Sequence, residues 1–188
     1  MDFNNFQPCY LIAMPELQDE NFHKSVILLT DYNKDGASGF IINRMTTLRL
    51  GDSVVLSDGS LNPDYEDLCL SYGGPVDPQK IWIVYDENIF SNPKDTFIGD
   101  DIMIAQDIDI LINHENTIEN DSLRIFHGYS GWGPQQLDNE IASSTWITAP
   151  LSRELLFDTP IDQIWNKAVQ NLGFDPNKLV GPKSPFLN

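Results

Sequence analysis

Short apolar runs separated by clusters of turn-forming residues dominate the first part of the chain. The run CYLIAM at 9–14 is rich in strand-forming residues. Two further runs, at 25–30 and 39–43, flank the polar cluster DYNKDGAS. Within this cluster Asp35-Gly36 is a hairpin signal, because glycine supplies the positive φ that a tight turn needs. These patterns predict one strand followed by an antiparallel hairpin.

The middle of the chain has weaker patterns. Residues 47–62 are ambiguous, with a short helix expected near 50–56 and a polar loop after it. The remaining expectations are strands at 68–72 and 81–85 around the turn-rich sequence GGPVDPQ, two short strands within 95–105, a short helix at 106–113, and strands at 123–127 and 145–149. The sequence thus predicts many short strands without a regular β-α-β alternation.

The last third carries the clearest helical pattern. Thr159 is suited to the N-cap, Pro160 to the first helical position, and Asp162 to the positive end of the helix dipole. Gly173 is suited to ending the helix. Apolar residues recur on one face between them: Ile161, Ile164, Trp165, Ala168, Val169 and Leu172.

Early hairpin strands and late helices predict an α+β fold with a C-terminal amphipathic helix. The chain has 188 residues, which suits one domain over 1–188, with a core at about 9–174 and a tail at 175–188.

The charge balance restricts the classes of partner. There are 11 Lys and Arg against 28 Asp and Glu, a formal net charge of −17. Such an acidic chain is unsuited to displacing counterions from nucleic acid or to binding an anionic membrane. Eight carboxylates without a Lys or Arg occupy 95–123, and we interpret them as a solvated face, with a cation site or a dock for a basic partner as alternatives. They are Asp95, Asp100, Asp101, Asp107, Asp109, Glu115, Glu119 and Asp121.

The cysteines and the first residues indicate the compartment. Cys9 and Cys69 lack metal or redox spacing and are expected to be buried, reduced thiols. The sequence MDFNNFQPCY has neither the basic segment nor the long apolar core of a signal peptide, and the apolar runs are too short to span a bilayer. We therefore expect a cytoplasmic protein without a membrane segment, a cofactor or a metal ion.

The hairpin sequence DYNKDG also matches the first half of a calcium loop. Position twelve of such a loop would be Ile42, where a bidentate Glu is needed, and the expected flanking elements are strands rather than helices. The hairpin interpretation is therefore preferred.

The stretch RIFHGYSGWGPQQLDNEI at 124–141 places three glycines between an expected strand and an expected helix. A nucleophile elbow needs glycine two residues after the serine, but Trp132 stands there, and His127 is only three residues from Ser130. Two interpretations remain open. The glycines either form an anion cradle at a helix beginning near Pro134, or they permit a tight corner while the tryptophan fills the core.

Residues 152–172 can be mistaken for a DNA-binding helix-turn-helix. The exposed face of the second expected helix carries a single cation, Lys167, whereas a recognition helix needs contacts to phosphates as well as to bases. The pattern argues against direct DNA recognition.

Five blocks of sequence together resemble the AlgH/YqgE family of small bacterial proteins. They are LIAMPELQDENFHKSV at 11–26, DGASGFIINR at 35–44, GGPV at 73–76, HGYSGWGPQQLDNEI at 127–141 and ELLFDTP at 154–160. The resemblance implies an α+β fold with coiled, largely antiparallel sheets and helices packed around them. The usual label of the family is transcriptional regulator, which rests on one member's role in exopolysaccharide control rather than on a demonstrated chemistry.

The resemblance also implies a candidate cluster, which could be a pocket or the residues that the fold requires. The positions that match the family are Asn43, Arg44, Gly73, Gly74, Pro75, Val76, Gly128, Gly131, Trp132, Gln136 and Leu137, and the loop adds His127 and Ser130. The chain departs from the family at Gln135, where Gly is common, and at Ser130, where relatives often carry Ala. The second departure weakens a nucleophilic role for that hydroxyl.

The expected function is regulation or assembly through a protein partner or a small ligand, without catalysis. The alternative is an enzyme or anion-binding protein that uses the Gly128–Gly133 loop with His127 and Arg44.

Overall fold

The structure is a computed structural model that describes residues 5–54, 61, 63–89, 92–106, 108–112 and 122–179. Its strands are β1 (Cys9–Ala13), β2 (Val26–Asn33), β3 (Gly36–Ile41), β4 (Met45–Arg49), β5 (Cys69–Tyr72), β6 (Val76–Asp86), β7 (Thr96–Gly99), β8 (Ile102–Ala105), β9 (Leu123–Trp132) and β10 (Trp146–Pro150). Its helices are α1 (Leu50–Ser53), α2 (Pro63–Glu66), α3 (Asp109–Ile112), α4 (Gln136–Ala142), α5 (Ile164–Asn171) and α6 (Pro176–Leu179), with a π-helical turn at Glu154–Asp158 and a 3₁₀ turn at Ile161–Gln163.

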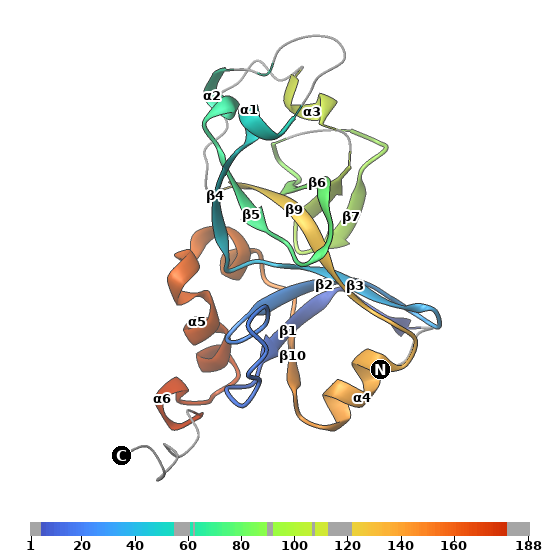
Figure 1. Cartoon of the computed structure of the whole chain (residues 1–188), viewed down its shortest axis with the longest axis vertical. Coiled ribbons are helices and arrows are strands. Elements are labelled where there is room, and N and C mark those ends of the chain that lie inside the picture. The colour runs from blue at the N-terminus through green and yellow to red at the C-terminus, as the bar shows by residue number, and fades with distance from the viewer. Residues whose placement is uncertain are drawn as a thin grey trace.

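Strand β9 joins the two halves of the sheet. The strand order is β10-β1-β2-β3-β9-β6-β8-β7, with β5 also beside β9 and β4 beside β5. The first half of β9 lies between β6 and β5, and its second half pairs with β3. In Figure 1 β9 runs from the upper half of the molecule, which contains β4 to β8, into the lower half, which contains β1, β2, β3 and β10. The β5–β9 pairing is parallel and the other pairings between the described strands are antiparallel.

Both faces of the sheet are covered around β1 and the first half of β2, which explains why these segments are continuous apolar runs. Tyr10 and Ile12 of β1 pack in the cluster that contains Phe157 and Trp165 from the C-terminal helical segment. The alternate residues Leu11 and Ala13 pack in a second cluster. That second cluster also contains Trp132, Leu137 and Trp146. The upper half has a third cluster under α1, α2 and α3, built from Leu50, Tyr65, Leu70, Ile83, Tyr85, Leu111 and their neighbours.

The predicted hairpin is confirmed, with a shift in its second strand. Strands flank the sequence as expected, but the two-residue turn is Lys34-Asp35 rather than Asp35-Gly36. Gly36 pairs with Asn33 and begins the second strand. The second strand occupies 36–41 rather than 39–43. It ends there because the Asn43 side chain takes over the local hydrogen bonds, accepting from the Val26 N–H at 2.9 Å and donating to the Lys24 carbonyl at 2.9 Å.

Two elements of the first half were not predicted. Strand β4 occupies 45–49 and is largely exposed, with Met45 and Leu48 each about half exposed, so it lacks the apolar alternation that marks a half-buried strand. Helix α2 is a single turn at 63–66. The short helix expected near 50–56 is α1 at 50–53.

The turn expected at GGPVDPQ covers less of the chain than predicted. Strand β6 already begins at Val76, which pairs with Tyr129, while Ile81 pairs with His127. Four residues of β6 therefore face one residue of β9, so 77–80 form a large bulge inside the strand. The short helix expected at 106–113 is α3 at 109–112, and the two short strands within 95–105 are β7 and β8.

The C-terminal helix is confirmed along its apolar face, but its predicted start is wrong. The Thr159 hydroxyl donates to the Glu154 carbonyl of the preceding π-helical turn at 3.0 Å, so it does not cap the helix. A 3₁₀ turn follows, and α5 begins at Ile164. Its end is as predicted, because Gly173 has φ +84° and donates its N–H to the Gln170 carbonyl at 2.8 Å.

The architecture is closest to α+β, dominated by the curled antiparallel sheet and with a modest helix content. Among the described members of the acidic stretch, Asp95 accepts from the Tyr85 hydroxyl at 2.6 Å, and Asp100 accepts from the Arg153 N–H. These two carboxylates therefore have structural partners, while 107, 115, 119 and 121 lie outside the described residues. No helix in the described ranges has the length and apolar character needed to cross a membrane.

Candidate functional site

Most of the candidate residues meet where three segments cross, which we call the strand junction and define as 43–44, 73–76 and 127–130. The Gly73 N–H donates to the His127 carbonyl at 3.0 Å, and the Gly73 carbonyl accepts from the Ile41 N–H at 3.0 Å. The Tyr72 N–H donates to the Arg44 carbonyl at 2.9 Å. Parts of three of the five blocks that carry the family resemblance thus lie together in space.

The junction requires glycine because the backbones approach too closely for a side chain. A Cβ at Gly74 would lie well under 3.0 Å from the backbone nitrogen of Ser130, and a Cβ at Gly128 would lie equally close to the Gly74 carbonyl oxygen. Gly128 also has φ +65°, in the left-handed region that glycine adopts without strain. A glycine inside a strand marks such a close approach or a bulge.

The stretch opening at Gly128 is therefore a strand and not the predicted loop. Residues 128–132 continue β9, and 130–132 pair with 37–39 of β3. The following helix begins at Gln136 rather than near Pro134 and has seven residues. This arrangement differs from the open loop that the anion-cradle interpretation assumed.

Three polar side chains of the junction, those of Asn43, Arg44 and Ser130, form hydrogen bonds within the protein. The Ser130 hydroxyl is fully buried and donates to the Gly73 carbonyl at 3.0 Å. The Arg44 Nη2 donates to the His23 carbonyl at 3.0 Å. Since a nucleophile must reach its substrate, the burial of Ser130 favours a structural role for its hydroxyl.

His127 lies against Tyr72, with ring centroids 5.5 Å apart in an edge-on arrangement. Its Nε2 is buried and has no hydrogen-bond partner among the described residues. Burial raises the pKa of the Tyr72 hydroxyl, the Arg44 guanidinium opposes that rise, and Asp19 adds to it. Tyr72 and His127 thus form an aromatic contact beside the junction. The use of His127 and Arg44 in a site stays a prediction.

Trp132 fills the core, as the corner interpretation expected, and is 7% exposed. Its Nε1 donates to Glu140 Oε2 at 2.8 Å, and Trp146 Nε1 donates to the same oxygen at 2.7 Å. Gln136 accepts from the Gly133 N–H at 3.0 Å and donates to Glu140 Oε1 at 2.9 Å. The sequence GWGPQQLDNE thus supplies the hydrogen bonds that hold α4 against the sheet. Glu140, the acceptor that these side chains share, was not among the predicted residues.

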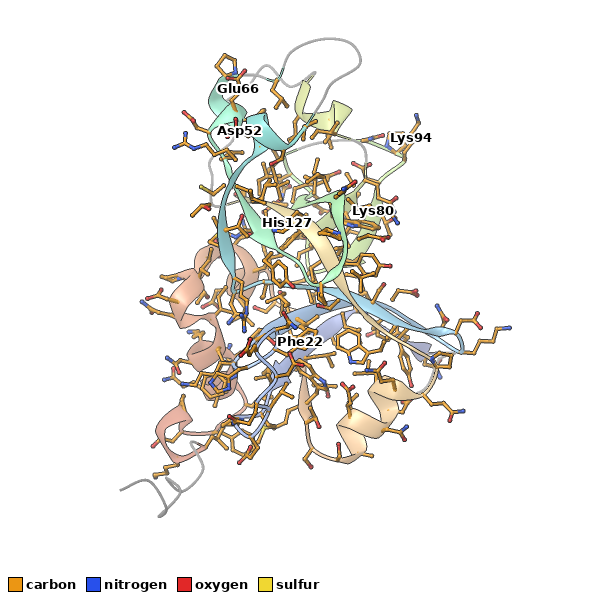
Figure 2. All side chains as sticks on the ribbon, viewed as in Figure 1. Phe22, Asp52, Glu66, Lys80, Lys94 and His127 are labelled. Carbon is orange, nitrogen blue, oxygen red and sulfur yellow. The ribbon has the colours of Figure 1, made fainter. Side chains whose placement is uncertain are left out.

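An open groove of about 500 Å³ lies immediately beyond the junction. One side is the β2–β3 hairpin, with Asp31, Asn33 and Asp35, and the other side is formed by β6 and β9, with Lys80, Trp82 and Tyr129. Ser38 and Gly131, which pair across β3 and β9, lie between the two sides. Figure 2 shows Lys80 to the right of His127 in the view.

Charged and aromatic side chains share the groove. The Lys80 ammonium lies 6.0 Å from the centroid of the Tyr129 ring and 2.7 Å from Asp77 Oδ2. The Trp82 and Tyr129 rings contact edge-on with centroids 6.4 Å apart. Of the predicted candidates, Val76, Gly131 and Trp132 line the groove, whereas Asn43, Arg44, His127 and Ser130 do not.

Sequence reasoning missed the groove residues Asp31, Lys80, Trp82 and Tyr129. Asp31 was assigned to a turn, Trp82 to an ordinary strand, and Tyr129 to the Gly128–Gly133 loop. The bulge sequence DPQK could have pointed to Lys80 and Trp82, because a bulge turns side chains away from the regular sheet pattern.

The cysteines differ from each other and from the prediction. Both are free, but Cys9 is only partly buried and Cys69 is exposed, so the expectation that both are buried is wrong for Cys69. Burial raises the pKa of the Cys9 thiol to about 11. In the part of the chain that the structure describes, no group of three or more His, Cys, Asp or Glu could hold a metal ion.

The AlgH-like family matches residues 10–177 of this chain. A UPF0301 protein from Coxiella burnetii (strain Dugway 5J108-111) is 35% identical over 173 residues, covering 92% of each chain. A UPF0301 protein from Myxococcus xanthus (strain DK1622) is 31% identical over 176 residues, covering 94% of this chain and 96% of that protein.

Two solved structures have the same fold. The solution structure of the AlgH protein from Pseudomonas aeruginosa has a TM-score of 0.74 and 27% identity, covering 94% of each chain. The crystal structure of a protein from Corynebacterium diphtheriae has a TM-score of 0.69 and 20% identity, covers 96% of this chain and 93% of that one, and supports the fold alone. The chain belongs to the AlgH-like family.

Proposed function

We propose that this protein is a non-catalytic binding protein that acts through the groove beside the strand junction, holding a protein segment or a small ligand. The observation that carries the proposal is the open groove itself, of about 500 Å³, with aromatic and charged side chains on its walls. Binding sites combine apolar and aromatic walls with a few polar groups that fix orientation. Catalysis is not part of the proposal, since the described groove residues lack a nucleophile paired with a base.

Direct DNA binding is also outside the proposal. The net charge of −17 opposes the approach of nucleic acid, and Lys80, the lysine that lines the groove, is already paired with Asp77. A regulatory role would then act through a partner rather than through an operator sequence.

A site-specific crosslinking experiment tests the proposal. A photoreactive residue at Asn33, on the groove rim, is compared with the same residue at Gln163, which is exposed on the 3₁₀ turn. Capture at position 33 alone, abolished by filling the groove with Gly131→Trp, is the expected result. Equal capture at both positions, or salt-sensitive binding to a defined DNA, would contradict it.

A further inference from the structure

We propose that the groove accepts a basic side chain, above all an arginine, carried by an extended segment of a partner protein. The inference rests on the proposed function and names the chemistry of the partner. It is carried by three features of the groove: the charges on the hairpin, the aromatic wall opposite, and the small residues between them.

The hairpin side of the groove is negative. Asp31 and Asp35 are exposed, and the Asn33 amide donates to Asp31 Oδ2 at 3.0 Å, which orients that carboxylate. Lys34 lies at the tip of the hairpin but does not line the groove. A planar guanidinium matches carboxylate geometry with two parallel hydrogen bonds, so an oriented carboxylate favours arginine.

The opposite wall already holds a cation against an aromatic ring. Lys80 places its ammonium over Tyr129, while Asp77 neutralises its charge at 2.7 Å. Lys80 is 60% exposed, so the ammonium can leave the ring when a ligand enters. Aromatic faces attract guanidinium groups, and Arg is the commonest partner in such contacts. The acidic hairpin wall thus matches the charge of an arginine side chain, and the aromatic wall matches its flat face.

The middle of the groove is built from small residues, which leaves room for a backbone. Ser38 and Gly131 lie side by side across β3 and β9. At Gly131 a Cβ would meet only ordinary contacts, the nearest at 3.5 Å from the Tyr129 ring. An extended segment can therefore lie along the strands while its basic side chain reaches the hairpin. The net charge of −17 would also steer a basic partner toward this protein.

The test uses the tripeptide N-acetyl-Gly-Arg-Gly-amide at millimolar concentration, with citrulline and glutamate versions as controls. Citrulline keeps the shape of arginine without its charge. Binding is mapped on the full chain by amide NMR spectra. The arginine probe is expected to shift the amides of 31–38, 76–82 and 129–131 in a saturable manner, with at least about fivefold higher affinity than the citrulline probe.

Matched charge variants separate the groove from the general acidity. Asp31→Asn with Asp35→Asn is expected to lower the affinity for the arginine probe at least about fivefold. Tyr129→Leu is expected to lower it about threefold. The control pair Glu16→Gln with Asp162→Asn removes two exposed charges elsewhere and is expected to change the affinity by less than about twofold.

The outcomes distinguish the two proposals. One adverse result is that the control pair weakens binding of the arginine probe as much as the groove pair does, and another is that the arginine probe shifts amides over all acidic surfaces. Either result would contradict the inference that the groove accepts a basic side chain. If the citrulline or glutamate probe binds in the groove as well as arginine does, the groove still binds a ligand but the inference fails. If no probe shifts groove amides and crosslinking at position 33 captures nothing, both fail.

Discussion

The strand junction and the groove use the same two segments of chain in opposite ways. At the junction the turn at 73–76 presses against β9 so closely that Gly74 and Gly128 leave no room for a Cβ. A few residues farther along, the bulge at 77–80 moves β6 away from β9, and the hairpin closes the far side of an open groove. One region is filled by backbone and the other is lined by side chains.

The difference separates two reasons why a residue can belong to a family signature. The glycines of the junction are explained by close backbone approach, so their place in the signature needs no ligand. The groove residues Asp31, Lys80 and Tyr129 are not required by the crossing, and a role for them must come from what they bind. Chemistry is therefore better sought in these groove side chains than in the glycines of the junction.

Substitution of Gly74 breaks the junction and has the largest expected effect. Gly74→Ala places a Cβ against the backbone of 129–130 at φ +148°, and we expect a loss of about 3 kcal/mol or more in unfolding free energy, or failure to fold. The matched Gly131→Ala, which adds a Cβ in the groove, should cost about 1 kcal/mol or less. Urea unfolding measures both, and equal losses would remove the distinction between junction and groove.

Substitution of Arg153 tests whether the junction alone holds the two halves together. Arg153 follows β10 and binds Asp86 of β6, Asp158, and through its N–H Asp100 of the β7–β8 turn. Asp86 is 6% exposed, so Arg153→Met leaves a buried carboxylate without its cation. We expect a loss of about 2 kcal/mol, discounted because the Arg153 side chain is 29% exposed. Lys178→Met, at an exposed ion pair, should cost less than about 0.5 kcal/mol.

The Arg153 contact also predicts a pH dependence of the protein's stability. Burial alone would raise the pKa of Asp86, but the Asn88 N–H and the Arg153 guanidinium together hold that pKa below its ordinary value. A carboxyl whose pKa is lower when folded stabilises the protein above its unfolded pKa of about 4, and this contribution is lost as pH falls through the folded pKa. The difference in unfolding free energy between wild type and Arg153→Met should therefore shrink in acid. A difference that stays constant with pH would contradict a role of Arg153 in lowering the pKa of Asp86.

Substitution of Glu140 loosens the support under the second half of β9. Glu140→Gln weakens the acceptor that Trp132 and Trp146 share, and we expect a loss of about 1 kcal/mol with a change in tryptophan emission. Glu20→Gln, at an exposed position outside this network, serves as the control. If both variants unfold at the same urea concentration as wild type, the network does not stabilise α4.

The smallest effect is a difference in thiol reactivity that leaves stability unchanged. The Cys9 thiol has a pKa raised to about 11 by burial, whereas Cys69 is exposed. Because the thiolate is the reactive form, Cys69 should react first with a disulfide reagent near pH 8 and Cys9 much more slowly. Cys69→Ser should remove the fast phase, and a fast phase that persists would show that Cys9 is accessible.

Local patterns were sufficient wherever neighbouring residues decide the structure. The hairpin at 33–36, the apolar face of α5 and its end at Gly173 were all predicted, because turn chemistry and helical periodicity act over a few residues. The predicted start of α5 was wrong because the Thr159 hydroxyl can bond either to the N-terminus of the following helix or to the preceding turn. In the structure it donates to the Glu154 carbonyl of the preceding π-helical turn.

The candidate site was predictable as a set of segments but not as an arrangement. The blocks around 43, 73 and 127 were identified together, and they do meet in space. Gly128 to Gly133 were assigned to a loop because glycine is common in turns, and no local signal shows that another backbone presses against these positions. The groove was missed because its two walls come from the hairpin and from the β6 bulge, about forty residues apart.

By itself the sequence determined the family, the strand-rich α+β character, the hairpin, the C-terminal amphipathic helix and an acidity that disfavours nucleic acid. Only the tertiary structure decided that β9 continues through its glycines, that Ser130 and Trp132 are buried, and that an open groove lies beside them. The physical reason is that periodicity and turn chemistry are local. Backbone crossings, buried hydrogen bonds and clefts arise instead from contacts between segments far apart in the chain.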